Sequence, residues 1–419
     1  MNSEAINLRK IYSCIDIGSH SLKLVVMEKV GDDFVVLSRS IVKSKGIKKG
    51  EIVDIEQAII SIKKLIEKTE EDLKVKIKEL LCLIPSEKAD FEMVVASIET
   101  DKEITGKTVE KVLNNAVLKN EDESRFVLSA IPVSYKIDDG DNLKEVKGLT
   151  GNVLISKVVL ATIPKVVVAS YVELFKQLNI KLIDVGFGIV GDYYNIKCKE
   201  LDSTATAVIN IGYDKCDVGI FNKGILIKSA KIDMGSRYVD KDIKYVYNVD
   251  TKTARYLKET FACSNTRYAD VDDVVTIKDK DDNQIVINQL KISEVVEARI
   301  SEILKFAKKQ ISILTKREIR YIIVTGGISE LAGFEYVLEN VFGRCARVLN
   351  MNKMGVRSNS FSSCVGFVEY FDEKLERLDK AYSMISDTEL DLMTKRTRKT
   401  SGESAIGGII GYFTGNKED

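Results

Sequence analysis

The residue types best suited to chemistry form a short turn near the beginning of the chain. The segment that starts at Asp16 reads Asp-Ile-Gly-Ser-His-Ser-Leu-Lys and lies between two apolar runs. A turn that contains Gly18 and the hydroxyl groups of Ser19 and Ser21 can direct backbone N–H groups toward a phosphate. Asp16 can hold a metal ion through water, and Lys23 can reach a terminal phosphate. The pattern indicates a phosphate-binding loop, and an ordinary β-hairpin with a strand-end aspartate is the alternative.

His20 lies in the same turn and is the single histidine of the chain. It can contact a phosphate or act as a base, or it can be a side chain at the solvent edge whose backbone matters more. We favour the second interpretation. A single histidine also excludes most zinc sites and nearly every His-based catalytic triad.

A second turn, about 195 residues later, stands in the same relation to its flanking apolar runs. It begins at Asn210 and reads Asn-Ile-Gly-Tyr-Asp-Lys-Cys-Asp, with Gly212 in the place of Gly18. Two such turns from two halves of a chain can clamp a polyphosphate between them. This turn also has features that disfavour a phosphate: Tyr213 restricts backbone approach, and Asp214 would repel a phosphate if it pointed inward. Lys215 could offset that charge.

A third candidate segment follows the apolar run 319–324. Two glycines, Gly326 and Gly327, are followed by Ile328, Ser329 and a predicted helix. Glycines at such a point let the backbone approach a flat ligand such as a nucleoside, and a helix N-terminus favours anions. A plain strand-to-helix turn is the alternative.

Apolar periodicity predicts the elements that must position these segments. Each of the first two turns joins two short strands, and a third strand follows, so the two halves of the chain repeat one unit. Between the halves, a strand, a helix capped by Thr105 and two more strands form a small module. Beyond Tyr370 the apolar pattern weakens, which predicts a linker. The predicted helices outside the module are 54–69, 165–177, 237–245, 251–260, 292–314 and 334–341.

Composition narrows the class of protein. The 419 residues are 45% hydrophobic and carry 63 basic and 63 acidic side chains. The length suggests about three folding units, and the zero net charge gives no broad attraction to nucleic acid, so we expect no nucleic-acid partner. Seven scattered cysteines without a CxxC pair fit a reducing compartment. The sequence contains no run of about 18 apolar residues, so we expect no transmembrane helix.

In this order and spacing, the three segments resemble the phosphate 1, phosphate 2 and adenosine motifs of the actin, Hsp70 and sugar-kinase superfamily. Four further segments narrow the resemblance to the FtsA family of bacterial cell-division proteins, and the resemblance covers about residues 10–372. These segments are 46–56, 103–105, 148–151 and 234–237.

The resemblance implies an α/β fold of the two-lobed actin/Hsp70-like ATPase type with an FtsA-type inserted strand–helix–strand subdomain. Residues 1–86 and 164–205 would form lobe 1, with residues 87–163 as the inserted subdomain. Residues 206–372 would form lobe 2, and residues 373–419 a linker and a membrane-targeting segment.

ATP and Mg²⁺ occupy the cleft between the lobes in this superfamily, and the resemblance implies the same cofactors here, with Asp16 holding Mg²⁺ through water. Asn210 keeps the size but lacks the charge of the usual aspartate. We therefore expect ATP binding with slow or absent hydrolysis, because positioning water and metal is most of what catalyses phosphoryl transfer. The implied nucleotide contacts are Asp16, Gly18, Ser19, His20, Ser21, Lys23, Asn210, Gly212, Tyr213, Asp214, Lys215, Gly235, Lys258, Gly326, Gly327, Ile328 and Ser329.

The resemblance also implies a function in cell division. FtsA proteins polymerise, bind the C-terminal tail of the tubulin-like protein FtsZ through the second lobe, tether the FtsZ ring to the cytoplasmic membrane and recruit later divisome proteins. We therefore expect a cytoplasmic protein that is peripheral on the membrane at the division septum. Arg299 and Lys305, on the predicted helix 292–314, are the expected contacts of the FtsZ tail.

The end of the chain has the spacing of an interfacial helix. Ile406, Ile409, Ile410 and Phe413 fall on one helical face, and the basic cluster 395–399 precedes them. Four glycines in this segment weaken a helix, so a frayed tail is the alternative to a membrane anchor.

Two other functions are compatible with the same superfamily. A small-molecule kinase would need a carboxylate base beside its acceptor, and Asp184 and Asp192 are available, although no motif assigns either one. An FtsA-like scaffold of type IV pilus assembly would share the fold but lack the membrane tail and the FtsZ contact.

Overall fold

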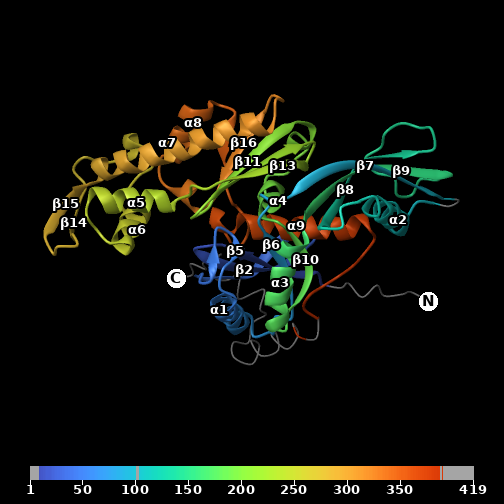
Figure 1. Ribbon diagram of the computed structural model, residues 1–419, viewed down its shortest axis with the longest axis horizontal. Helices are drawn as coiled ribbons and strands as arrows, with labels where there is room; N and C mark the ends of the chain where they lie inside the picture. Colours follow the sequence, from blue (N-terminus) through green and yellow to red (C-terminus); the bar gives the residue numbers. More distant parts are fainter. Residues whose placement is uncertain (1–8, 101–102, 387–388, 390–419) are drawn as a thin grey trace, which may run out of the picture.

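The computed structural model describes residues 9–100, 103–386 and 389 (Figure 1). In this part of the chain, two five-stranded sheets form the centres of two lobes, and a module with a three-stranded sheet is inserted in the first lobe. The α/β two-lobed fold with its insertion is therefore as the sequence predicts.

The two five-stranded sheets have the same topology. Their strand orders are β3-β2-β1-β6-β10 and β13-β12-β11-β16-β17. In each sheet, the three strands that come first in the sequence form an antiparallel meander. Two strands from later in the sequence then extend the sheet on the other side of the first strand, and both run parallel to it. This repeat confirms the predicted internal duplication. The bounds are β1 (Ile11–Ile17), β2 (Ser21–Val30), β3 (Asp33–Lys43), β6 (Glu79–Ile84), β10 (Lys181–Phe187), β11 (Ala205–Ile211), β12 (Cys216–Asn222), β13 (Ile225–Ile232), β16 (Tyr321–Thr325) and β17 (Ala346–Val348).

Helices cover both sheets, mostly where the apolar pattern predicts them. Asp54 caps the first of them, since its carboxylate accepts a hydrogen bond from the Gln57 N–H at 3.0 Å. The longest helix begins at Gln289 rather than at the predicted residue 292, because Asn288 caps it ahead of its first buried side chain. The bounds are α1 (Ile55–Leu73), α3 (Lys165–Gln177), α5 (Arg237–Val246), α6 (Thr251–Thr260), α7 (Gln289–Leu314) and α8 (Phe334–Phe342).

A small hairpin beside α5 and α6 was not predicted. It consists of β14 (Val274–Lys278) and β15 (Gln284–Asn288) and lies at one end of the second lobe (Figure 1). A second short pair, β4 (Ile47–Lys48) and β5 (Glu51–Ile52), precedes α1.

The inserted module matches the predicted elements closely. Its sheet has the order β7-β9-β8, and its one long helix packs against all three strands. Thr105 lies at the N-terminus of that helix, where it exchanges hydrogen bonds with Thr108. The bounds are β7 (Asp90–Glu99), α2 (Gly106–Val117), β8 (Arg125–Ile137) and β9 (Val153–Pro164).

Two helices cross at the junction between the lobes. They are α4 (Gly188–Tyr194) and α9 (Ser362–Arg377). Their backbones touch at two glycines, since a Cβ atom added to Gly366 would lie 1.9 Å from the carbonyl oxygen of Gly191. Only glycine permits so close a crossing.

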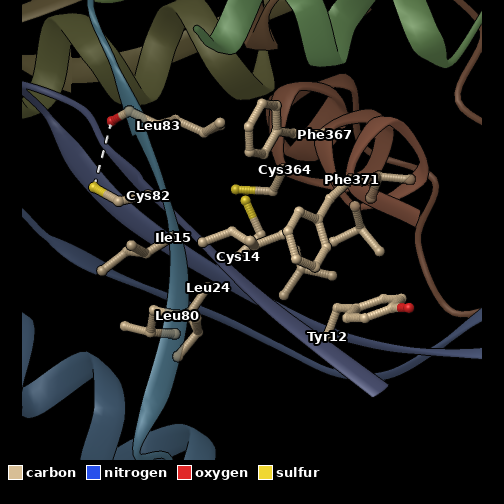
Figure 2. Close-up of a cluster of buried hydrophobic side chains, with 14 of the residues drawn as sticks. Tyr12, Cys14, Ile15, Leu24, Leu80, Cys82, Leu83, Cys364, Phe367 and Phe371 are labelled. Carbon is tan, nitrogen blue, oxygen red and sulfur yellow. Dashed lines mark hydrogen bonds between the residues drawn. The ribbon is translucent and has the colours of Figure 1, made fainter. Parts of the chain in front are cut away.

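Helix α9 belongs to the core of the first lobe. Figure 2 shows Cys364, Phe367 and Phe371 of α9 packed against Tyr12 and Cys14 of β1. The helix continues to Arg377, beyond the predicted start of the linker at residue 373.

The chain after α9 is also fixed to the first lobe. The Met384 N–H donates to the Ile11 carbonyl oxygen at 2.9 Å, and both Met384 and Ile385 are buried. The residues around Met384 are therefore docked beside β1, where the sequence predicts a linker. The four predicted membrane-contacting residues, Ile406, Ile409, Ile410 and Phe413, lie outside the described residues.

Candidate phosphate-binding cleft

A cleft of about 330 Å³ lies between the two lobes, and all three candidate segments line it. Gly18 and Gly212, the central glycines of the two predicted phosphate loops, both belong to its wall. The predicted residues that line it are Asp16, Gly18, Ser19, His20, Ser21, Lys23, Asn210, Gly212, Tyr213, Asp214, Lys215, Lys258, Gly326, Gly327 and Ile328.

The two loops occupy equivalent places in the two sheets. Asp16 pairs with Lys23 across β1 and β2, and Asn210 pairs with Asp217 across β11 and β12. Each loop is therefore a tight turn between the first two antiparallel strands of its sheet. The equivalence explains how segments so far apart in the sequence face each other.

Asp16 and Lys23 form an ion pair inside the cleft. The Lys23 Nζ atom lies 2.8 Å from Asp16 Oδ2. Burial lowers the pKa of Lys23, but the charge and hydrogen bond of Asp16 outweigh it, and the net pKa is raised. Lys23 is therefore a permanent cation beside Gly18, available to an anionic ligand.

The charged residues of the second loop, Asp214 and Lys215, are both paired with side chains of opposite charge. The negative charge of Asp214 is therefore offset before any phosphate binds. Asp214 is buried and pairs with Arg237 at 2.9 Å, so its carboxylate is already neutralised. Lys215 lies 3.2 Å from Glu87 and 2.9 Å from Asp217. The lysine thus connects the second loop to Glu87 of the other lobe, at the start of the inserted module.

Asn210 is part of a buried polar network beneath the cleft. Its Nδ2 atom donates to Asp192 at 2.7 Å and to Ser363 at 3.2 Å. Asp192 also accepts hydrogen bonds from the hydroxyls of Ser362 and Ser363, both at the beginning of α9. Burial raises the pKa of Asp192 to about 6, although these three donors lower it.

This network explains the amide at position 210. A carboxylate there would place a second negative charge at hydrogen-bond distance from the fully buried Asp192. The amide instead donates to Asp192, and Ser362 extends the network to Thr325 at the end of β16. The network therefore joins α4, α9, β11 and β16 under one ligand site.

His20 makes a side-chain contact that the sequence did not predict. It is half-buried, and its ring lies 4.5 Å from the ring of Tyr213 in the other lobe. Burial, followed by the charges of Arg255 and Lys258, lowers the pKa of His20 to about 4. The side chain is therefore neutral near pH 7.

The third segment approaches the second loop with its backbone. Gly326 has φ +103°, and a Cβ atom there would lie 2.3 Å from the Ile211 carbonyl oxygen. Ser329 does not line the cleft, because it is buried and donates its hydroxyl to the Gly326 carbonyl oxygen at 2.7 Å. Its contribution is to hold the turn.

Gly235 also supports the cleft from outside. A Cβ atom at Gly235 would lie 2.6 Å from the carbonyl oxygens of Gly212 and Tyr213, so this glycine lets the chain pack on the second loop. Lys258 is buried and pairs with Asp240 at 2.7 Å.

Sequence reasoning missed several residues of the cleft wall. Gly50, Ser86, Gly188 and Asn359 line the cleft from segments that carry no phosphate-binding pattern. Gly50 lies within the segment 46–56, which carries only the family resemblance. The other three have no local signal, because they reach the cleft only through the packing of distant elements.

The two predicted partner contacts lie on α7, away from the cleft lining. Arg299 bonds to Asp242 at 2.9 Å through Nη2, and its guanidinium also lies over the ring of Tyr238. Lys305 is exposed, and its ammonium makes no ion pair within the part of the chain that the structure describes.

The described residues contain no cluster of three or more His, Cys, Asp or Glu side chains arranged for a metal ion. Mg²⁺ at a nucleotide site, however, usually keeps several waters and takes only one or two protein carboxylates besides the phosphates. Asp16 lines the cleft with about a quarter of its side chain exposed, so it can serve as such a ligand. The residues present therefore fit a hydrated Mg²⁺ held mainly by a nucleotide.

Among residues 9–100, 103–386 and 389, no helix has both the length and the apolar composition needed to cross a bilayer.

Two family models match the chain, and together they cover more than half of it. The model "Cell division protein FtsA" matches residues 207–366, and "SHS2 domain inserted in FTSA" matches residues 89–162. The second match coincides with the inserted module.

Relatives named "Cell division protein FtsA" match over most of their length. The protein of Bacillus subtilis is 23% identical over 87% of this chain and 84% of its own. The protein of Streptococcus pneumoniae is 26% identical over 87% and 81%, and that of Staphylococcus epidermidis is 27% identical over 88% and 82%.

Solved structures with the same fold are more distant in sequence. The "PilM-PilN type IV pilus biogenesis complex" aligns with a TM-score of 0.57 and 12% identity, over 86% of this chain and 98% of the other. MreB5 of Spiroplasma citri bound to AMPPNP aligns with a TM-score of 0.54 and 14% identity, over 88% and 97%. These likenesses show an actin-like fold.

Proposed function

We infer that this chain, which belongs to the FtsA family of cell division proteins, is a nucleotide-binding scaffold of the division site. The proposal has four parts: it binds ATP with Mg²⁺ in the interlobe cleft, polymerises, binds the C-terminal tail of FtsZ, and tethers the FtsZ ring to the cytoplasmic face of the membrane. In this role it recruits later divisome proteins.

One observation carries the nucleotide part of the proposal: the turns that contain Gly18 and Gly212 line one cleft from opposite lobes. A triphosphate between them would meet backbone N–H groups from both turns and the ammonium of Lys23. The third segment, with Gly326 and Gly327, would receive the nucleoside. Three lysines line the cleft, Lys23, Lys215 and Lys258, and each is paired with a carboxylate. A bound triphosphate would share these cations with the carboxylates, and Mg²⁺ would supply the remaining positive charge.

We propose that hydrolysis is slow or absent. Asn210 is neutral, and both donor positions of its amide are used by Asp192 and Ser363. Asp192 is fully buried and accepts three hydrogen bonds, so it is not free to take a proton from an attacking water. Bound Mg²⁺ would supply charge neutralisation on the phosphates, with Asp16 as its carboxylate.

Loss of the Lys23 ammonium should weaken nucleotide binding. In Lys23→Ala we expect the dissociation constant of the Mg–ATP analogue AMPPNP to rise about 10- to 100-fold, the size expected for one lost charged hydrogen bond. Isothermal titration calorimetry measures this. Lys29→Ala is the matched control, because Lys29 is on the same strand but pairs with Asp372 outside the cleft. Equal affinity in the two variants would contradict the site.

Binding of an FtsZ tail peptide separates a division scaffold from the alternatives. A pilus scaffold or a small-molecule kinase would not bind it. Charge reversal at the exposed Lys305 should weaken binding of this peptide at least fivefold, as measured by fluorescence anisotropy, whereas Lys107→Glu on the inserted module should not. Arg299 is less suitable for this test, since its ion pair with Asp242 would also be lost. Unchanged binding in Lys305→Glu would remove this residue from the contact.

A further inference from the structure

We propose that His20 and Tyr213 form an aromatic clasp across the cleft that controls how fast a nucleotide enters and leaves, and that Arg255 positions Tyr213 for this contact. This inference rests on the proposed nucleotide site and names the residues that set the rates of nucleotide binding and release there.

The clasp connects the two lobes at the level of the two candidate phosphate loops. The ring centroids of His20 and Tyr213 are 4.5 Å apart, with 34° between the ring planes. Both residues line the cleft, and both are half-buried. The pair belongs to the two loops themselves and joins them across the cleft. Phosphates that enter or leave the space between the loops would therefore have to pass this contact.

Arg255, on α6, holds both ends of the tyrosine side chain. Its guanidinium carbon lies 4.9 Å from the centroid of the Tyr213 ring, and its Nη2 atom donates to the Tyr213 hydroxyl at 2.6 Å. Asp240 lies 3.5 Å from the Arg255 Nε atom and orients the guanidinium in turn. With ring and hydroxyl both bound, Tyr213 is fixed in the position that meets His20.

The electrostatics of the site keep His20 uncharged. Burial lowers its pKa to about 4, and the charges of Arg255, Lys258 and Lys43 act in the same direction, while Asp240 opposes them. The imidazole therefore packs against Tyr213 as a neutral ring and does not neutralise a phosphate at pH 7. This separates the clasp from a cationic phosphate contact, the other role that the position of His20 suggested.

Stopped-flow release of a fluorescent nucleotide (mant-ADP with Mg²⁺) from the full-length chain tests the clasp. In His20→Ala and Tyr213→Ala we expect dissociation about three- to tenfold faster than in the wild type, as for loss of one aromatic pair. His20→Phe keeps an aromatic ring and should restore a rate close to that of the wild type. Wild-type rates in both alanine variants would overturn the clasp while leaving the nucleotide site intact. Failure of the wild type to bind the nucleotide would overturn both.

The role of Arg255 is tested by whether its effect on the release rate depends on His20, which a purely structural role would not produce. We expect Arg255→Met to accelerate release as Tyr213→Ala does, and we expect no further acceleration when it is combined with His20→Ala, because both act on one contact. Additive effects would remove Arg255 from the clasp.

The neutral state of His20 has its own test. We expect the wild-type release rate to stay constant between pH 5.5 and 8. A pH dependence of the release rate that disappears in His20→Phe would show that the histidine is charged, which would contradict the neutral ring pair.

Discussion

Replacement of Gly366 by alanine is expected to destabilise the folded protein by about 3 kcal/mol, although alanine is the better helix former. The reason is the crossing of α4 and α9. The added methyl group would lie 1.9 Å from the Gly191 carbonyl oxygen, and a backbone atom within a helix cannot move aside as a side chain can. The two helices would have to separate. Urea unfolding followed by circular dichroism measures the effect as a lower midpoint.

Gly188→Ala is the matched control for this prediction. Gly188 is in the same helix pair, but a Cβ atom there would lie 3.5 Å from the Ser363 Cβ atom, an ordinary contact distance. We expect a much smaller change in the unfolding midpoint. If Gly366→Ala were as stable as the wild type, the two helices would not be in backbone contact.

Substitution of Asp192 is expected to have an effect of similar size. Asp192→Ala removes the acceptor that Asn210, Ser362 and Ser363 share, and a loss of about 3 kcal/mol is expected from the three hydrogen bonds. Asp192→Asn keeps the size and one acceptor oxygen but removes the ionisation. Comparison of the two variants therefore separates the hydrogen bonds from the charge.

The ionisation of Asp192 should appear as a pH-dependent stability. Burial raises its pKa from 3.8 to about 6 in the folded state, so the folded chain binds this proton more tightly than the unfolded chain. The resulting stabilisation is complete below pH 3.8 and is lost as the pH rises through 6. Between pH 4 and pH 7, the wild type should lose roughly 2 kcal/mol relative to Asp192→Asn. A difference that does not vary with pH would contradict the buried, titrating carboxylate.

The candidate phosphate loops could be predicted from the sequence because each loop and its two flanking strands form one continuous stretch of the chain. Gly18 and Gly212 lie in turns between consecutive strands, and the apolar runs on either side fix those strands. The inserted module could be predicted for the same reason, since alternation and the Thr105 cap define its elements within one continuous stretch.

Helix α9 could not be predicted because it lacks a polar face over most of its length. Between Ser362 and Phe371 nearly every residue is buried, since the helix lies between α4 and the strands β1 and β2. A helix that is surrounded in this way shows no 3.6-residue periodicity. Its charged last turn then resembles the start of a linker.

The details of the cleft depend on contacts between distant residues, which no local pattern reports. Asp192 takes one of its hydrogen bonds from a residue 171 positions away, and Arg255 reaches Tyr213 across 42 positions. The sequence could place Asn210 and Tyr213 in a phosphate loop and mark them as unusual. It could not show that Asn210 donates to a buried carboxylate, or that the ring of Tyr213 packs against His20.

The most direct test of the nucleotide site is a crystal structure of the full chain with AMPPNP and Mg²⁺. We predict the phosphates between the turns of Gly18 and Gly212, with the Lys23 ammonium within hydrogen-bond distance of one of them. An analogue bound with its phosphates in contact with only one lobe, or bound outside this cleft, would contradict the proposed function.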